Sequence, residues 1–406
     1  MRIVMKFGGS SLATAEHIRR AARLVADQRR QGDQVAVVVS AQGDTTDRLL
    51  LQAQELSPRP ALREMDMLLA CGEQLSMALL AIRLEAIDCP AMSFCGWQAG
   101  ILTGDSHGRA PILSVEPQRV LQALEEGRVA VVAGFQGVTA GAEITTIGRG
   151  GSDTTAVALA DALGADVCRI YTDVRGVCSA DPRVVEQAQV YREISYDEML
   201  AMAHLGARVL HSRAVELARE KQVRVEVRST FAPEDAGTAL CPAEQEEPAV
   251  RGITCDEPIT MLTVFGIGSG NETCRLFELL DESGVSVDVI IRSAGGEKGR
   301  VGFSVSGADG DRTAALLREH QQALGFSGLL VQTELAKVSV IGSMSGCAVA
   351  AKMLRALEGG GIGPQYITTG ALRASVIVRQ EQARQAVRLL HESFFGEGAS
   401  NNKATL

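Results

Sequence analysis

Three glycine-rich segments of the sequence carry side chains that could do chemistry on an anion. The first is Lys6-Phe-Gly-Gly-Ser10, where Lys6 supplies a cation and Gly8 and Gly9 let the backbone approach a ligand closely. An apolar run precedes it and a helical pattern follows, which predicts a turn whose free amides face an anion. Alone, the segment is also compatible with a purely structural turn, and it matches neither the P-loop nor the Gly-x-Gly-x-x-Gly pattern.

The second and richest segment is Gly148-Arg-Gly-Gly-Ser-Asp-Thr-Thr155, followed by a helical pattern from Ala156 to Leu163. It combines backbone amides, a guanidinium and hydroxyls at one spot, which suits an anionic substrate or a transferring phosphoryl group. Asp153 could merely cap the helix. Arg149, however, has little reason to lie between glycines for packing, so we predict an anion site here.

The remaining candidates lie at the predicted ends of strands or within a helix. The third segment, Tyr171 to Arg183, is dense in turn formers, and at the carboxyl end of a parallel strand such a loop binds ligands. Taken alone it could equally be a set of solvated turns. Ser40 to Thr46 also follows an apolar run, whereas Glu73 lies in a helical apolar pattern, where a glutamate usually faces solvent.

The composition sets the class of protein to which these segments belong. The chain has 406 residues, of which 46% are apolar and 22% charged, which predicts two or three globular domains and excludes disorder. A net charge of -9 without a basic run argues against nucleic acid as a partner. We therefore expect a small-molecule substrate.

Cysteine spacing and the first residues indicate the compartment. The nine cysteines are dispersed without a Cys-x-x-Cys pair, which argues against a zinc site or a disulfide framework, and no carboxylate cluster has metal-ligand spacing. Lys6 interrupts the place where a signal peptide needs an apolar core, and we find no apolar run long enough for a membrane span. We expect reduced thiols in a cytoplasmic protein, with no membrane partner.

The elements that must position the candidate residues follow from the apolar pattern. Short Val/Ile-rich runs alternate with helical patterns near residues 15–31 and 46–56. Runs of this kind are typical of strands buried on both faces of a parallel sheet. The pattern predicts an α/β fold to about residue 230, with strands at Ile3–Phe7, Gln34–Val39, Val129–Phe135 and Val167–Tyr171.

The remainder of the chain looks duplicated after a linker. Four prolines and an acidic run between Phe231 and Pro258 predict the linker. Thr263–Gly266 and the segment after it then recur from Ser339–Gly342, which predicts two βαββαβ units. We therefore expect a large α/β domain over residues 1–245 and two smaller modules over 259–330 and 335–397.

These motifs, taken in order, resemble the aspartate kinases of the amino-acid kinase superfamily. The resemblance runs through Lys6–Ser11, Ser40–Asp47, Gly72-Glu73, Gly96–Gly100 and the highly specific Gly148–Thr155. It covers nearly the whole chain, because aspartate kinases also end in two ACT-type regulatory modules. The implied fold is an open, mainly parallel sheet sandwiched by helices, followed by two ACT-type α+β modules.

The resemblance implies transfer of the ATP γ-phosphoryl group, with Mg²⁺, to the side-chain carboxylate of L-aspartate. The product, 4-aspartyl phosphate, is the entry to lysine, threonine and methionine synthesis. A carboxylate with a pKa of about 3.9 is already ionised at neutral pH, so the reaction needs no general base. The resemblance also implies a homo-oligomer, a dimer formed through the ACT-like modules.

The same resemblance assigns residues to roles. It makes Lys6, Arg149 and Asp153 catalytic. Aspartate would be held by Ser40, Thr45, Glu73, Arg149, Gly150, Gly151 and Ser152. The nucleotide would be held by Lys6, Gly8, Gly9, Ser10, Thr172, Asp173, Cys178, Asp181, Arg183 and Arg208, and no protein side chain is assigned to a metal.

Some positions depart from the family pattern. Arg175 replaces an acidic residue, Cys178 an aromatic or hydroxyl residue, and Arg208 a lysine, which leaves the nucleotide contacts open. The effector segments of the two modules, 269–272, 343–346 and 368–371, lack the expected acidic residues. We therefore hypothesise weak or altered feedback inhibition.

Two other functions stay open at this point. A kinase of the same superfamily could act on glutamate or N-acetylglutamate, although the duplicated C-terminal modules weigh against it. Alternatively, the chain could be a catalytically silent amino-acid sensor, which the retained Lys6, Arg149 and Asp153 disfavour.

Overall fold

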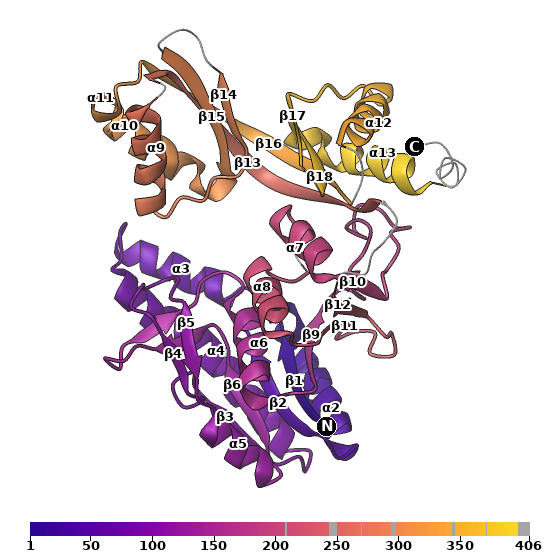
Figure 1. Cartoon of the computed structure of the whole chain (residues 1–406). Helices are drawn as coiled ribbons and strands as arrows, with labels where there is room; N and C mark the ends of the chain where they lie inside the picture. The colour runs from indigo at the N-terminus through magenta and orange to yellow at the C-terminus, as the bar shows by residue number, and fades with distance from the viewer. Residues whose placement is uncertain are drawn as a thin grey trace. The chain divides into compact units, whose positions relative to one another are not determined.

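The computed structural model describes residues 1–207, 209–242, 250–268, 270–293, 298–342, 346–370 and 372–396 (Figure 1). It divides into two units. The first comprises Met1–Cys178, Val190–Ala203 and Arg208–Gln245. The second comprises Ser179–Gln189, His204–Ala207 and Glu246–Leu406, so it includes two short segments that come from within the first two hundred or so residues.

The first unit alternates strands and helices. Its strands are β1 (Arg2–Phe7), β2 (Gln34–Val39), β3 (Ala91–Phe94), β4 (Ile101–Thr103), β5 (Ile112–Val115), β6 (Val129–Ala133), β7 (Gln136–Val138), β8 (Ile144–Thr146), β9 (Val167–Thr172), β10 (Glu193–Ser195), β11 (Val225–Ser229) and β12 (Thr238–Cys241). Its helices are α1 (Gly9–Leu12), α2 (Ala15–Arg30), α3 (Thr45–Leu56), α4 (Leu62–Glu85), α5 (Gln118–Glu125), α6 (Gly151–Leu163), α7 (Tyr196–His204) and α8 (Ser212–Lys221).

An eight-stranded sheet in the order β10-β12-β11-β9-β1-β2-β6-β3 forms the centre of this unit. Its pairs are parallel except for β11 with β12. The expected α/β class with a mainly parallel sheet is confirmed. Since parallel strands all end at the same edge, the loops that follow β1, β2, β6 and β9 meet there.

Helices cover both faces of this sheet, which explains why its strands are apolar throughout. Met5 and Phe7 belong to the core that includes residues of α2 and α4. Successive side chains of a strand point to opposite faces, so Lys6 points to the other face, where α6 contacts β1. The alternation thus sends a single polar side chain towards the start of α6.

Helix α4 is the longest helix of the unit and connects the large sheet to a small one. It contacts β3 and β6 of the large sheet and β8 of the four-stranded sheet β5-β4-β7-β8. By length and composition α4 could cross a membrane, because an 18-residue stretch of it has a mean hydropathy of 1.5. In the fold, 44% of that stretch is buried. It also buries Asp66 and Glu73, as expected of a core helix with polar partners.

The second unit contains the strands β13 (Val250–Gly268), β14 (Ile290–Ser293), β15 (Lys298–Ser306), β16 (Gly328–Gly342), β17 (Tyr366–Thr369) and β18 (Arg373–Arg379). Its helices are α9 (Asn271–Glu282), α10 (Gly310–Glu319), α11 (Gln321–Leu324), α12 (Gly346–Gly359) and α13 (Ala383–Phe395). The predicted duplication is confirmed, because β13-α9-β14-β15-α10 and β16-α12-β17-β18-α13 follow the same order.

Two long strands run through both copies. All pairs of the sheet β14-β15-β13-β16-β18-β17 are antiparallel. The second half of β13 pairs with β15 of the first copy, whereas its first half pairs with the part of β16 that borders β18. Figure 1 shows α9 to α11 beside one end of these strands and α12 and α13 beside the other.

The expectation of a linker between Phe231 and Pro258 is wrong for much of that stretch. Residues 238–241 form β12, and β13 already begins at Val250. Proline content misled the prediction, since the backbone amides between these prolines still join sheets. Helix α6 also begins at Gly151, earlier than the apolar pattern from Ala156 indicates.

Candidate active site

The loops at the carboxyl edge of the large sheet are tied to one another by backbone hydrogen bonds. The amide of Ser40, after β2, donates to the carbonyl of Phe7 at 3.1 Å. The amide of Gly8, after β1, donates to the carbonyl of Tyr171 at 3.2 Å. The segments that begin at Lys6, Ser40 and Tyr171 therefore lie together at this edge.

A buried ion pair joins the first and second segments. Lys6 Nζ lies 2.6 Å from Asp153 Oδ1, and both residues are 9% exposed. Lys6 comes from the end of β1 and Asp153 from the first turn of α6. Burying two charges carries a desolvation cost, which their mutual attraction offsets only when the geometry is good. The close contact with Asp153 therefore holds the Lys6 ammonium in one position at this edge.

The glycines after Lys6 differ in their roles. Because the Gly8 amide donates to Tyr171, it is not the free phosphate donor that the sequence predicted. A Cβ at Gly9 would lie 2.8 Å from the carbonyl oxygen of Ala41, so only glycine fits between the two loops. The amides of Gly9 and Ser10 lie in the first turn of α1, where a helix supplies no carbonyl partner for them.

The segment around Arg149 is shaped by two left-handed glycines, Gly148 and Gly150, with φ of 87° and 68°. A Cβ at Gly150 would come 2.1 Å from Cγ of His211 in the first unit. Glycine is therefore required for both its conformation and its clearance. Arg149 between them is exposed, and among the residues that the structure describes it has no ion-pair partner.

The start of α6 is packed closely against the turn after β6. A Cβ at Gly134 would lie 2.8 Å from Cβ of Ser152, and the Phe135 amide donates to Thr155 Oγ1 at 3.1 Å. Ser152 and Gly151 are buried at this contact. The helix start that carries Asp153 is thus held by the same turn that ends β6.

Glu73 is buried, contrary to the usual position of a glutamate in a helix. It is 4% exposed, and its Oε1 accepts a hydrogen bond from the Ala41 amide at 3.1 Å, while Oε2 has no partner among the described residues. Burial raises the pKa of Glu73 to about 7. Thr45, buried at the start of α3, belongs to the loop that Glu73 holds.

The nucleotide candidates are divided between the two units. Thr172 and Asp173 end β9 in the first unit, where Thr172 Oγ1 donates to Asp173 at 3.0 Å. Cys178 forms a bridge with Val190 where the chain leaves that unit. Asp181 and Arg183 pair with each other at 2.8 Å in the second unit, and Arg208 lies outside the described residues.

Sequence reasoning missed a second buried carboxylate beside the Arg149 segment. Asp66 of α4 is fully buried and accepts hydrogen bonds from His107, Gly108 and Thr146. The available signal was its spacing, because Asp66 precedes Glu73 by two helical turns and shares its face. Among the described residues no group of three His, Cys, Asp or Glu could hold a metal ion.

Family models match both parts of the chain. The model described as "Amino acid kinase family" matches residues 1–229, and one described as "ACT domain" matches residues 338–394. Curated relatives match over nearly the full length. The chain is 45% identical to "Aspartokinase 2" of Bacillus subtilis, covering 97% of each chain, and 41% identical to "Aspartokinase" of Corynebacterium glutamicum, covering 97% and 96%.

Solved structures show the same similarity. E. coli aspartokinase III in complex with aspartate and ADP matches with a TM-score of 0.82 and 28% identity, over 97% of this chain and all of that chain. The aspartate kinase from Synechocystis matches with a TM-score of 0.54 and 38% identity, over 97% of this chain and 69% of that chain.

Proposed function

Because the chain belongs to the amino acid kinase family and is an ATP-dependent aspartate kinase, we propose that the carboxyl edge of its large sheet brings ATP and L-aspartate together. The observation that carries this proposal is the buried Lys6–Asp153 pair beside the exposed guanidinium of Arg149. Two anions must meet for the reaction to occur, and fixed cations at one edge lower the repulsion between them.

Lys6 and the β1–α1 turn take the phosphoryl half of the reaction in this proposal. The Lys6 ammonium approaches the transferring oxygens, and Asp153 holds it in place. The amides of Gly9 and Ser10 supply donors, whereas the Gly8 amide keeps its bond to Tyr171. In such a reaction the protein acts mainly by positioning and by stabilising charge.

Arg149 and Glu73 take the aspartate half. The planar guanidinium of Arg149 can grip the α-carboxylate of aspartate with two hydrogen bonds. The unpartnered Oε2 of Glu73 is a buried acceptor, which suits the substrate ammonium. We also assign the orientation of the substrate to neighbours in the same segments, namely Ser40, Thr45, Gly150, Gly151 and Ser152.

The nucleotide is proposed to lie over the ends of β1 and β9, near Thr172 and Asp173. E. coli aspartokinase III was solved with aspartate and ADP, which supports a shared site for the two ligands. Mg²⁺ would be held mainly by the phosphates of the nucleotide, as is usual for this ion. Bound in that way, the metal neutralises phosphate charge.

Assembly, regulation and compartment also belong to this proposal. ACT-type modules support a homodimer formed through the second unit, and E. coli aspartokinase III was also solved with lysine and aspartate. We propose that feedback inhibition in this chain is weak or altered, since its effector segments lack the expected acidic residues. Residues 269, 343–345 and 371 of those segments lie outside the described residues. The nine free thiols and the use of ATP favour the cytoplasm.

The direct test is ATP- and magnesium-dependent acyl phosphate formation, trapped as the hydroxamate. Aspartate is compared with glutamate and N-acetylglutamate, each with and without lysine plus threonine. We expect turnover of aspartate alone, little changed by the two amino acids. Strong inhibition by them at millimolar concentration would contradict the proposal on regulation and leave the activity standing.

The site assignment needs variants. Arg149→Ala should raise the KM for aspartate by about a hundredfold, because a bidentate charged contact to the substrate is lost. The matched control is Arg30→Ala, which removes an exposed arginine on α2. An unchanged aspartate KM in Arg149→Ala would remove Arg149 from the proposed site.

A further inference from the structure

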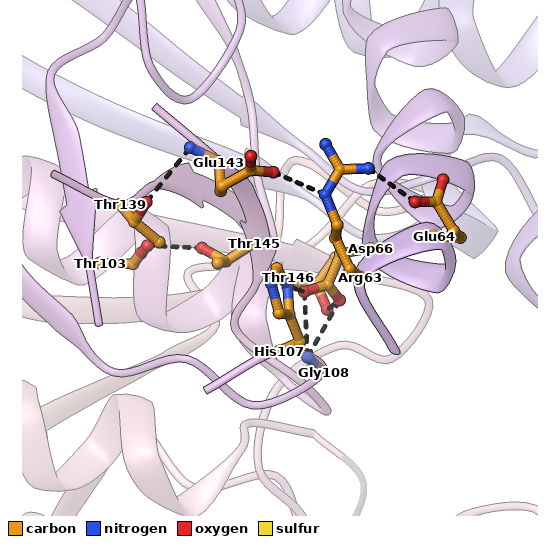
Figure 2. A network of polar contacts seen from close by, with 10 residues as sticks. All are labelled: Arg63, Glu64, Asp66, Thr103, His107, Gly108, Thr139, Glu143, Thr145 and Thr146. Carbon is orange, nitrogen blue, oxygen red and sulfur yellow. Dashed lines mark hydrogen bonds and ion pairs between the residues drawn. The ribbon is translucent and has the colours of Figure 1, made fainter. Parts of the chain in front are cut away.

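A polar network supports the Arg149 segment, and the sequence of that segment does not reveal it. Figure 2 shows Asp66 at the centre of this network, with side chains or backbone from two other segments pointing towards its carboxylate. Asp66 comes from α4, Thr146 from β8, and His107 and Gly108 from the loop between β4 and β5. These segments are far apart in the sequence, so the carboxylate links them.

Every oxygen of this carboxylate is satisfied. Thr146 Oγ1 donates to Oδ1 at 2.5 Å, and the Gly108 amide donates to both oxygens at 3.0 and 3.1 Å. An ionised carboxylate only accepts, so His107 donates from Nδ1 to Oδ2, at 2.7 Å. Asp66 itself is 0% exposed, and a buried charge with this many donors fixes the groups around it.

The network reaches Arg149 through two short connections. Thr146 is the last residue of β8 and lies three residues before Arg149, and its carbonyl accepts from the Ala110 amide at 2.9 Å. A Cβ at Gly148 would lie 3.1 Å from the carbonyl oxygen of Gly108. The Asp66 carboxylate therefore sets the position of both the strand and the loop against which the Arg149 turn rests.

The same helix holds the other half of the substrate site. Glu73 follows Asp66 by two turns of α4, about 10 Å along the axis, and binds the Ala41 amide in the loop after β2. One rigid helix thus fixes the loop proposed for the substrate ammonium and the loop proposed for its carboxylate. The distance between them depends on where Asp66 anchors β8.

We infer that Asp66, acting through Thr146 and Gly108, is a positioning residue that sets Arg149 at the distance from Glu73 that L-aspartate requires. The inference rests on the proposed role of Arg149. Asp66 does not touch substrate, so its loss misplaces the guanidinium without removing it. Misplacement by about 1 Å can cost up to a hundredfold in such an arrangement.

Neighbouring threonines on β8 provide a matched pair of variants. Thr146 donates to Asp66, whereas Thr145 Oγ1 bonds Thr103 Oγ1 at 2.5 Å, on the opposite side of the strand in Figure 2. Both are buried, Thr145 with 0% exposure and Thr146 with 1%. Thr146→Val and Thr145→Val thus remove the same hydroxyl from the same strand, but only the first touches the network.

The experiment measures the KM of aspartate and of ATP together with the thermal midpoint. We expect Thr146→Val to raise the aspartate KM about tenfold and to leave the ATP KM within about twofold, while Thr145→Val changes neither KM. The two variants should lose similar thermal stability. Asp66→Asn should also raise the aspartate KM, and by more than Thr146→Val does. Equal aspartate KM values in the two threonine variants would overturn the inference.

A double-mutant cycle separates this inference from the proposed function. If Thr146 acts through Arg149, then Thr146→Val should add nothing to the aspartate KM in an Arg149→Ala background. A tenfold rise in both backgrounds would show that Thr146 acts on another group and would overturn the positioning role. An Arg149→Ala enzyme with a normal aspartate KM would instead contradict the role of Arg149.

Discussion

The two units treat buried charge in different ways. In the first unit, Glu73 keeps one carboxylate oxygen without a partner among the described residues, whereas Lys6 and Asp153 form a buried ion pair. In the second unit, buried Lys337 is balanced by Asp288 and by Asp256 at 3.5 Å. An unpartnered buried acceptor costs stability, so we infer that a ligand completes the pairing of Glu73 in the first unit.

The largest effect on kcat should appear when two variants are compared, in each of which one buried lysine is replaced by methionine. Lys6→Met should lower kcat by about a thousandfold or more, because it removes a fixed cation from the transferring phosphoryl group. Lys337→Met is the matched control in the second unit and should keep its basal kcat. Turnover by trapped hydroxamate, with a thermal midpoint for each variant, checks both. A normal kcat in Lys6→Met would contradict the view that the buried lysine of the first unit serves catalysis and that of the second unit does not.

The second effect concerns two left-handed glycines at the ends of α6. Gly150→Ala should lower kcat/KM for aspartate by about a hundredfold, because the new Cβ would come 2.1 Å from His211 Cγ and displace Arg149. Gly164→Ala has similar strain, with φ of 57°, but no atom within 4 Å of the added Cβ. It should cost about 1 kcal/mol of stability and leave the kinetics unchanged. Equal kinetic losses would mean that clearance at Gly150 has no role.

The third effect is a pH dependence centred on Glu73. With its pKa raised from 4.5 to about 7, the folded protein binds this proton more tightly than the unfolded chain does. The resulting stability is present at low pH and is lost as pH rises through 7, by about 1 kcal/mol between pH 6 and pH 8. Glu73→Gln should remove this loss, measured by denaturant unfolding at both pH values.

Aspartate binding should show the opposite pH trend. Only ionised Glu73 attracts the substrate ammonium, so the aspartate KM should be about tenfold higher at pH 6 than at pH 8. The Gln variant should have a high KM at both pH values. Exposed Glu16 on α2 gives the control, since Glu16→Gln should show the same pH dependence of the aspartate KM as the wild type. A wild-type KM that is flat with pH would contradict the proposed ammonium contact.

The smallest effect is expected in the second unit. Lys337→Met removes the cation that faces Asp288 and Asp256, yet both acids are about a third or more exposed and can be hydrated. We expect a loss of about 2 kcal/mol of stability, because the pair is only half buried. Unfolding followed by circular dichroism would check this. No loss at all would show that the pairing in this unit is not needed for its stability.

Much of the first unit follows from local pattern. The apolar run Gln34–Val39 matches β2 at both ends, because a strand buried on both faces is marked by each of its residues. Helix α6 begins before the apolar pattern from Ala156, since its first turn, with Gly151, Ser152 and Asp153, carries small and polar residues. The apolar periodicity that marks the rest of the helix is therefore absent from this turn.

What escaped the sequence depends on contacts between distant segments. Nothing local to Asp66 indicates that it meets Thr146, which lies 80 residues away. The Gly8 amide likewise looked free, since its partner Tyr171 belongs to a strand that is far away in the chain. The register of β1 against β9 determines the Gly8 contact, and the packing of α4 against β8 determines the Asp66 contact, so neither can be read from adjacent residues.

The long strands β13 and β16 have a consequence for how the second unit can be divided. Each strand contributes its two halves to different copies of the duplicated pattern, so a cut between the copies leaves both without a strand. A gene fragment that ends between α11 and β16 would expose a sheet edge of the first copy. The duplication therefore behaves as one inheritable block, which can be gained, lost or fused to another enzyme only as a whole.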